Sequence, residues 1–268
     1  MRKILAILLS VFLLCPGVQA AEIQPKYAAL TFENCPGRNI PELLDALDSL
    51  GAKATFFLRG DRMRDYPEQA NMIAERGHEI GLSCFGSASF VPLTRRQIAG
   101  ELAETKALLP KKCDVAFVRP PDGVFTHGLH QVAQVTNLSL LGWSEEPFRW
   151  ETQEGHLTGQ IRDGDVIRIR DISAGSIGGT LSLIRQLQKQ GYRLVTVSQL
   201  AKARKIRIHP GETYTAFPQK KPTPPNKRSG SCFFILPPER CGRYPAGSDP
   251  RWWVRPSSGP GHSCSWGR

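Results

Sequence analysis

Between residues 27 and 200, short runs rich in apolar and β-branched residues alternate with stretches whose apolar positions recur at helical spacing. Seven of the short runs are typical of strands: residues 27–32, 54–58, 78–83, 115–118, 138–143, 166–170 and 193–197. Strands that alternate with helices predict parallel βα units with right-handed crossovers. We therefore expect an α/β fold, a distorted (β/α) barrel of about seven parallel strands. A doubly wound open sheet is the alternative, because the same periodicity fits it.

Local signals mark the ends of the predicted helices. Helices over residues 40–50, 66–76 and 177–190 are each followed by or end at a glycine, which favours a helix stop: Gly51, Gly77 and Gly191. Thr94 followed by Gln97 predicts a capping box at the start of a helix that reaches residue 109. In a barrel of this type the chemistry lies at the C-terminal ends of the strands, so these ends hold the candidate residues.

The first 20 residues are typical of a secretory signal peptide. Arg2 and Lys3 precede an apolar run over residues 4–14, and a stretch of small residues ends at Ala20, where we expect cleavage. The run is shorter than the roughly 20 residues that a membrane-spanning helix needs. We expect an exported protein that is secreted, periplasmic or envelope-associated, with no integral membrane segment after cleavage.

The remaining chain is expected to form one domain over residues 21–208 and a low-complexity basic tail over residues 209–268. Residues 218–268 contain ten Pro and six Gly and carry a net charge of +7. This composition is typical of a linker, a disordered tail or a shifted reading frame. Of the chain's net charge of +11, only +2 falls on residues 21–217, which argues against a nucleic-acid-binding domain.

Six motifs lie in order along the predicted domain: ALTFENCP at 29–36, ATFF at 54–57, GHEIG at 77–81, FVRPPDG at 117–123, WSEEP at 143–147 and GYRLVTVS at 191–198. Together they resemble the polysaccharide deacetylase (NodB-homology) family over about residues 27–200. The resemblance implies metal-assisted removal of acetyl groups from glycans such as chitin-like oligomers or peptidoglycan. In that family an Asp acts as base, a second Asp and two His bind a divalent metal such as zinc, and a later His protonates the leaving group.

The resemblance places these roles on different residue types here. The base falls on Glu33, and Arg119 stands where the family uses an Arg to orient the base. The metal-binding positions fall on Asn34, Ser83 and Ser87, none of which is a residue type that zinc sites are built from.

The position of the acid His falls on Arg170, beside Asp171, and an arginine stays protonated and cannot cycle a proton. We therefore expect a catalytically impaired member without a bound cofactor, in which Glu33, Arg119 and Asp171 are vestiges of the site. The groove is expected to contact an N-acetylglucosamine-containing polysaccharide or peptidoglycan through aromatic side chains: Phe32, Phe85 and Trp143.

Two other functions fit the same residues. Cys35 and Cys84 each follow a replaced position, so with Glu33 and His127 or His130 they could form a rearranged metal site in an active deacetylase. The two cysteines could equally form a disulfide or remain free thiols; no two cysteines have the CxxC spacing of a zinc knuckle. The other function is a non-enzymatic scaffold that binds the envelope through its basic tail.

A pair of carboxylates flanking one glycosidic bond would indicate a glycosidase. Glu145 and Glu146 are adjacent and point to opposite faces of a strand, which excludes them as that pair. Glu33 with Glu146 is the combination that remains.

Overall fold

The computed structural model describes residues 25–111, 113–121, 123–146, 161–170 and 172–219. The expected signal peptide lies outside the described residues, as do Asp171 and residues 220–268 of the expected tail. The described part of the chain contains eight strands: β1 (Lys26–Cys35), β2 (Ala54–Leu58), β3 (Glu79–Leu82), β4 (Phe117–Val118), β5 (Ser139–Leu141), β6 (Val166–Ile169), β7 (Tyr192–Val195) and β8 (Thr213–Tyr214). Its helices are α2 (Ile40–Ser49), α3 (Gly60–Asp65), α4 (Pro67–Glu75), α5 (Arg95–Ala107), α6 (His127–Val135), α7 (Ala174–Lys189) and α8 (Val197–Ala203).

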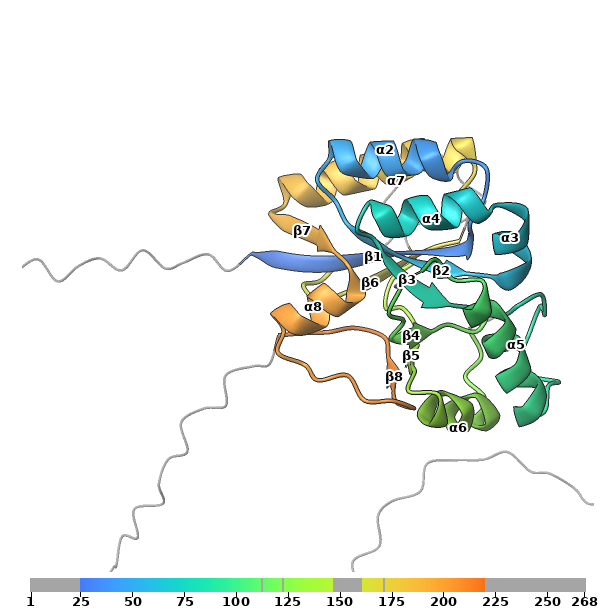
Figure 1. The fold of residues 1–268 in the computed structure, drawn as a ribbon. Helices are drawn as coiled ribbons and strands as arrows, with labels where there is room; N and C mark the ends of the chain where they lie inside the picture. Colours follow the sequence, from blue (N-terminus) through green and yellow to red (C-terminus); the bar gives the residue numbers. More distant parts are fainter. Residues whose placement is uncertain (1–24, 112, 122, 147–160, 171, 220–268) are drawn as a thin grey trace, which may run out of the picture. The chain divides into compact units, whose positions relative to one another are not determined.

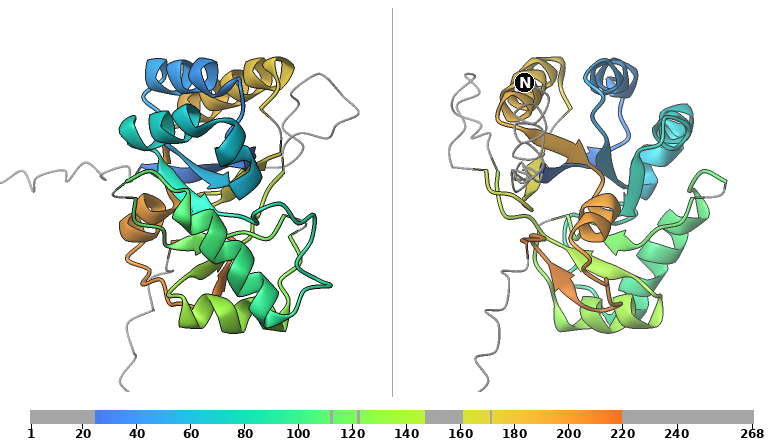
Figure 2. Two further views of the ribbon diagram at one scale, coloured as in Figure 1. Left: turned by 45° about the vertical axis from the view of Figure 1, so that its right-hand side comes forward. Right: turned by 90° about the vertical axis from the view of Figure 1, so that its left-hand side faces the viewer.

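The strands form one curled sheet in the order β6-β1-β2-β3-β4-β5-β8, and β7 pairs with the first half of β1. All of these pairings are parallel. Glu145, four residues after the end of β5, forms a parallel β-bridge with Ile167 of β6. This bridge connects the two sides of the curled sheet and closes it into a barrel. The predicted barrel is therefore confirmed, and the open doubly wound sheet is excluded. Helices lie around the outside of the curled sheet (Figures 1 and 2).

Alternation along β1 separates the inside of the barrel from its helical coat. Leu30 and Phe32 pack outward with α2 and α7, whereas Thr31 and Glu33 point into the barrel, where Arg119 donates to both. An inner apolar cluster fills the lower part of the barrel: Ala29, Phe57, Phe117, Leu141, Val166, Val197, Leu200, Ala201 and Phe217. At the end of the barrel where the strands terminate, by contrast, the interior is polar and holds Thr31, Glu33 and Arg119.

Most of the helix signals in the sequence are confirmed. Gly51, Gly77 and Gly191 have φ values of 59°, 70° and 84°, a left-handed conformation that ends each preceding helix. The capping box of Thr94 and Gln97 is present at the start of α5. The sequence analysis missed α3, and it missed α8, although Thr196 and Gln199 form a second capping box.

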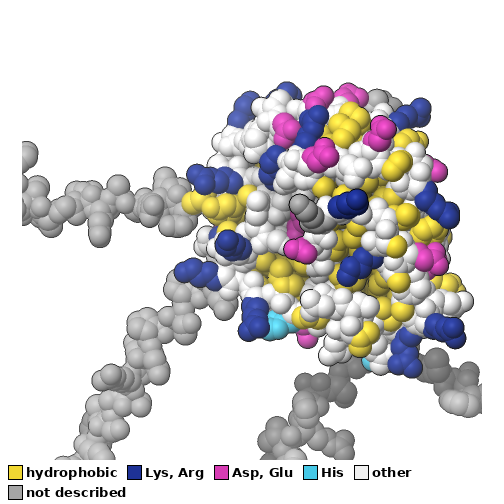
Figure 3. Space-filling model, viewed as in Figure 1, with side chains coloured by type: hydrophobic (Ala, Val, Ile, Leu, Met, Phe, Trp, Pro, Cys, Tyr) yellow, Lys and Arg dark blue, Asp and Glu magenta, His cyan; other side chains and the backbone are white. Residues whose placement is uncertain are grey.

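The domain extends beyond residue 208, where the tail was expected to begin. β8 pairs with β5, and Phe217 is fully buried in the inner cluster. No strand pattern marks β8, because it is two residues long and follows Pro210 and Gly211 closely. None of the described helices has the length and apolar character needed to span a membrane. On the face drawn in Figure 3, basic and acidic side chains are interspersed.

His78, at the end of the barrel opposite to Glu33, gives a test of this packing. Its Nδ1 accepts a hydrogen bond from the Ala54 N–H at 3.2 Å, and burial lowers its pKa from 6.5 to about 4. Between pH 6.5 and 4 the unfolded chain takes up a proton that the folded chain does not. The free energy of unfolding should therefore fall by about 3 kcal/mol as the pH drops through this range.

Urea denaturation at pH 7 and pH 4.5 measures this loss, and the substitution His78→Gln, which keeps an acceptor for Ala54, should remove most of it. The exposed His209 provides the control, because His209→Gln should retain the loss seen in the parent chain. An unchanged pH dependence in His78→Gln would contradict the assignment.

Candidate functional site

A bulge at the end of β1 turns the side chain of Glu33 into the barrel and leaves that of Asn34 exposed to solvent. The pairing of β1 with β2 shifts register between Phe32 and Cys35, and Asn34 has a φ of 54°. Asn tolerates this left-handed conformation better than most residues. The bulge keeps Glu33 buried inside the barrel while Asn34 is exposed at its rim. Bulges of this kind commonly re-aim side chains next to functional sites.

Arg119, the residue after β4, is 1% exposed and holds Glu33 from within the barrel. Its Nη1 donates to Thr31 Oγ1 at 2.8 Å and to Glu33 Oε1 at 3.3 Å. Its Nε and Nη2 donate to the carbonyl oxygens of Leu141 and Gly142 at 3.0 and 2.7 Å. A guanidinium with all three nitrogens engaged is fixed in place, and it fixes β1, β4 and β5 relative to one another.

Arg168, in β6, holds the other oxygen of the same carboxylate. Its Nη2 lies 2.7 Å from Glu33 Oε2, and its guanidinium carbon lies 3.8 Å from the centre of the Trp143 ring. A guanidinium stacked on an indole gains cation–π energy as well as shielding from water. Both carboxylate oxygens of Glu33 thus accept a charge-assisted hydrogen bond from an arginine.

The charges continue outward as an alternating series. Arg168 Nη1 lies 3.6 Å from Glu146 Oε2, and Glu146 Oε1 lies 2.6 Å from Arg170 Nε. The side chains of Arg119, Glu33 and Arg168 are 1%, 8% and 5% exposed, whereas those of Glu146 and Arg170 at the outer end are 28% and 44% exposed. We call these five residues the ion-pair chain. Glu33 and Glu146, the combination considered for a glycosidase, are both partners of Arg168 in this chain.

Burial affects the acid–base behaviour of the innermost member. Desolvation lowers the pKa of Arg119 to about 10, against the opposing effect of the Glu33 carboxylate. Arg119 nevertheless stays protonated at neutral pH, so Glu33 keeps its cationic partner. Removing Glu33 would leave the buried Arg119 without a carboxylate partner, whereas removing Arg119 would leave Glu33 with Arg168 as its remaining partner.

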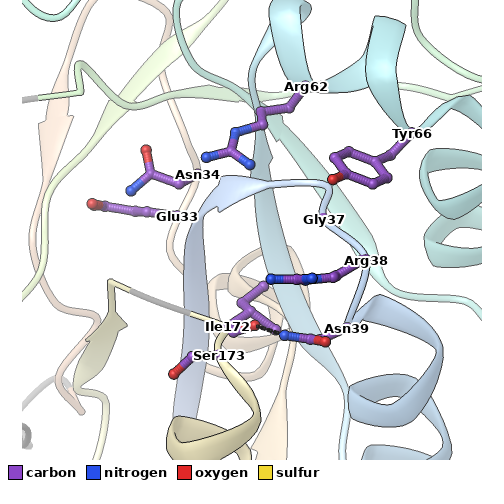
Figure 4. A pocket seen from close by; sticks show the side chains of 9 residues that line it. All are labelled: Glu33, Asn34, Gly37, Arg38, Asn39, Arg62, Tyr66, Ile172 and Ser173. Atoms are coloured by element: carbon purple, nitrogen blue, oxygen red, sulfur yellow. Dashed lines mark hydrogen bonds between the residues drawn. The ribbon is translucent and has the colours of Figure 1, made fainter.

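A pocket of about 490 Å³ opens on the rim beside Glu33 (Figure 4). Mostly polar residues from three segments at or after the ends of strands line it: Glu33, Asn34, Gly37, Arg38, Asn39, Arg62, Tyr66, Ile172 and Ser173. Arg62 reaches it from α3 and Arg38 from the loop before α2. The sequence analysis did not single out either arginine.

The positions that the resemblance assigns to the metal do not fit a zinc ion as they stand. The Asn34 amide is exposed and donates to the Arg170 carbonyl oxygen at 3.4 Å. The Ser87 hydroxyl donates to Glu101 Oε1 at 2.8 Å, so it belongs to the loop before α5. Ser83 supplies a neutral hydroxyl, and zinc sites are built from thiolate, imidazole and carboxylate. No cluster of three or more His, Cys, Asp or Glu side chains in the described residues could hold a metal ion.

The rearranged site built on Cys35 and Cys84 is also absent from the described residues. Both are free thiols that pack in different apolar clusters on the outside of the sheet. Cys35 Sγ donates to the Glu33 carbonyl oxygen and Cys84 Sγ to that of Ser87. Burial raises the pKa of both thiols, which disfavours the thiolate that binds metal. His130 contacts Thr126 and Thr213 instead.

The three aromatic residues expected to contact glycan have different environments. The expectation for Phe32 is wrong: it is 1% exposed and stacks on Phe56 at 4.9 Å, because alternation along β1 turns it away from the barrel interior. Phe85 is half-buried against Gly60 and lies 4.9 Å from the guanidinium of Arg64. Trp143 is half-buried and adjoins the ion-pair chain through Arg168.

Comparison with known proteins agrees with this geometry. A family model described as polysaccharide deacetylase matches residues 20–141. The predicted resemblance to the polysaccharide deacetylase family is therefore confirmed over these residues.

Two curated polysaccharide deacetylases illustrate the relationship. The chain is 28% identical over 200 residues to the peptidoglycan-N-acetylmuramic acid deacetylase PdaC of Bacillus subtilis. The aligned region covers 72% of this chain and 42% of PdaC. It is 27% identical over 191 residues to a peptidoglycan-N-acetylglucosamine deacetylase of Bacillus cereus, covering 67% of this chain and 70% of that protein.

Solved structures of deacetylases and esterases share the fold. The structure of a T48 deacetylase with substrate matches with a TM-score of 0.64 and 27% identity, over 71% of this chain and 96% of the other. A family 4 acetyl xylan esterase from Clostridium thermocellum, in complex with a cobalt ion, matches with a TM-score of 0.65 and 25% identity, over 72% and 100% of the two chains. These matches confirm the barrel fold.

Arg168 is the site residue whose sequence signal was overlooked. It lies between Ile167 and Ile169 in a strand that is otherwise apolar, and alternation places it on the same face as Arg170. A charged residue inside a buried strand needs a partner of opposite charge. Glu33, the acidic residue near the end of the neighbouring strand β1, is that partner.

The gradient of exposure along the ion-pair chain predicts a gradient in stability. Arg119→Met should lower the free energy of unfolding by about 3–5 kcal/mol, because it removes one of the two cations that neutralise Glu33 and leaves the buried carbonyl oxygens of Leu141 and Gly142 without their donor. Arg170→Gln, at the exposed end, should cost less than about 1 kcal/mol. Urea denaturation of the two variants measures both values, and equal costs would show that the inner pair is not the anchor of the barrel.

Proposed function

We propose that this chain is an exported, glycan-binding member of the polysaccharide deacetylase family that does not hydrolyse acetyl groups. The observation that carries this proposal is the double clamp on Glu33, whose two oxygens are held by Arg119 and Arg168. A general base must accept a proton from water in the reaction, and here both of its oxygens already serve guanidinium donors.

The donor set supports the same conclusion. A bound divalent metal would polarise the acetyl carbonyl and supply an activated water. We infer that Asn34, Ser83 and Ser87 replace the ligands that would hold it. Arg170 cannot serve as a general acid, a role that contributes about 10²–10⁴-fold to rate where it exists.

The relatives indicate the class of glycan. PdaC and the Bacillus cereus protein are named for deacetylating N-acetylmuramic acid and N-acetylglucosamine in peptidoglycan. The polar pocket beside Glu33 and the half-buried Trp143 provide hydrogen bonds and an aromatic surface for such a polymer. We therefore propose N-acetylated envelope glycan as the ligand, reached after export by the leader over residues 1–20.

Two measurements on the mature chain test the proposal. Calorimetry should detect binding of N-acetylglucosamine tetramer or of a peptidoglycan disaccharide. Acetate release from the same ligands should stay at background, with and without added zinc or cobalt. Metal-dependent acetate release would instead identify a divergent deacetylase, and absence of binding to every glycan would leave a scaffold function.

Restoring the family's residues should reveal what the clamp does. The variant N34D/S83H/S87H/R170H should gain zinc affinity, measured by calorimetry, yet release little acetate because Arg168 still holds Glu33. Adding Arg168→Met, which keeps length without charge, should raise acetate release well above that of the four-substitution variant. The matched control adds Glu33→Gln and should be inactive. Equal activity with and without Arg168→Met would show that the clamp does not block the base.

A further inference from the structure

The pocket beside Glu33 carries positive charge that no described residue neutralises. Arg38 and Arg62 both line it, and neither guanidinium forms a hydrogen bond or an ion pair with the residues that the structure describes. The arginines of the ion-pair chain, by contrast, are all paired. Glu33 is the acidic residue in the lining, and two other arginines already neutralise it. The pocket therefore presents an excess of positive charge to a ligand.

Two helices begin at the same pocket and add to this field. α7 follows Ser173, and α2 follows Asn39, so the positive ends of both helix dipoles face the pocket lining. The Asn39 side chain does not cap α2, because its Nδ2 donates to the Ile172 carbonyl oxygen at 2.8 Å. That bond ties the two helix starts together and fixes the spacing between them.

The remaining lining suits a sugar. Asn34, Tyr66 and Ser173 offer an amide and two hydroxyl groups, which match the hydroxyls of a sugar ring. The volume of about 490 Å³ falls within the range of about 300–1,000 Å³ that is usual for small-molecule sites. In Figure 4 the polar ends of Arg38, Arg62 and Tyr66 extend toward the same space.

We propose that this pocket binds the carboxylate of an acidic N-acetylated sugar, with Arg38 and Arg62 as the residues that select it. The proposal rests on the glycan-binding function above and names the unit of the glycan that is recognised. Arginine pairs with a planar carboxylate through two parallel hydrogen bonds, which gives direction as well as charge attraction. A neutral N-acetylated sugar would leave both guanidinium groups without an anionic partner.

The test compares two ligands that differ in one charge. The probes are the N-acetylglucosamine–N-acetylmuramic acid disaccharide and its methyl ester, titrated calorimetrically into the mature chain. The free acid should bind about ten- to a hundredfold more tightly than the ester, as expected for a hydrogen bond between charged groups. Arg38→Gln and Arg62→Gln should each reduce the preference for the acid and leave the affinity for the ester nearly unchanged.

Arg64 provides the matched control, because it lies on the same helix as Arg62, is exposed and does not line the pocket. Arg64→Gln removes the same charge from α3 and should keep the full preference for the acid. Equal affinities for acid and ester in the parent chain would overturn the carboxylate site while leaving glycan binding intact. If neither ligand binds, the proposed function fails and the carboxylate site fails with it.

Discussion

The buried contact between Arg119 and Glu33 is the constraint on which the rest of the site depends. A guanidinium that is 1% exposed must satisfy its donors inside the protein, and it does so on β1 and on the end of β5. The barrel interior therefore cannot be apolar throughout: its lower part is filled by the inner cluster, and its upper part is organised around charge. Glu33 is held so firmly that the residues around it, rather than its own chemistry, decide what the site does.

The parts of this structure that could be predicted from the sequence depend on residues that are close to one another along the chain. Periodicity identified seven strands, and glycines in left-handed conformation ended the helices at Gly51, Gly77 and Gly191. The features that the sequence analysis missed or misplaced depend on contacts between residues far apart in the sequence or on the face of a strand. β8 is defined by its pairing with β5 more than by its two residues. Phe32 was assigned to the groove, although it adjoins Glu33 in the sequence and adjacent strand residues face opposite sides of a sheet. Arg168 was overlooked although it is a charged residue in a buried strand, because its partner Glu33 lies 135 positions away in the sequence.

A carboxylate at the end of β1 needs a positive neighbour, and two kinds of neighbour are available to a barrel of this family. One is a divalent metal ion, and the Clostridium thermocellum esterase is a neighbour in fold whose structure contains a cobalt ion. The other is a guanidinium supplied by the chain itself, as Arg168 does here. The two differ in what they leave free. A metal keeps a coordination position open for water, whereas a guanidinium donates hydrogen bonds and activates nothing.

Charge compensation also divides the upper end of the barrel into two functional halves. Along the ion-pair chain every arginine has a carboxylate partner, so these residues contribute structure and have little capacity left for a ligand. Arg38 and Arg62, a few residues away on the rim, have no such partner among the described residues. Since Glu33 belongs to both halves, its neutralisation by Arg119 and Arg168 is what allows the rim to stay positive. The two arginines that hold Glu33 thereby leave Arg38 and Arg62 in the neighbouring pocket without an acidic partner among the described residues, an arrangement suited to an anion.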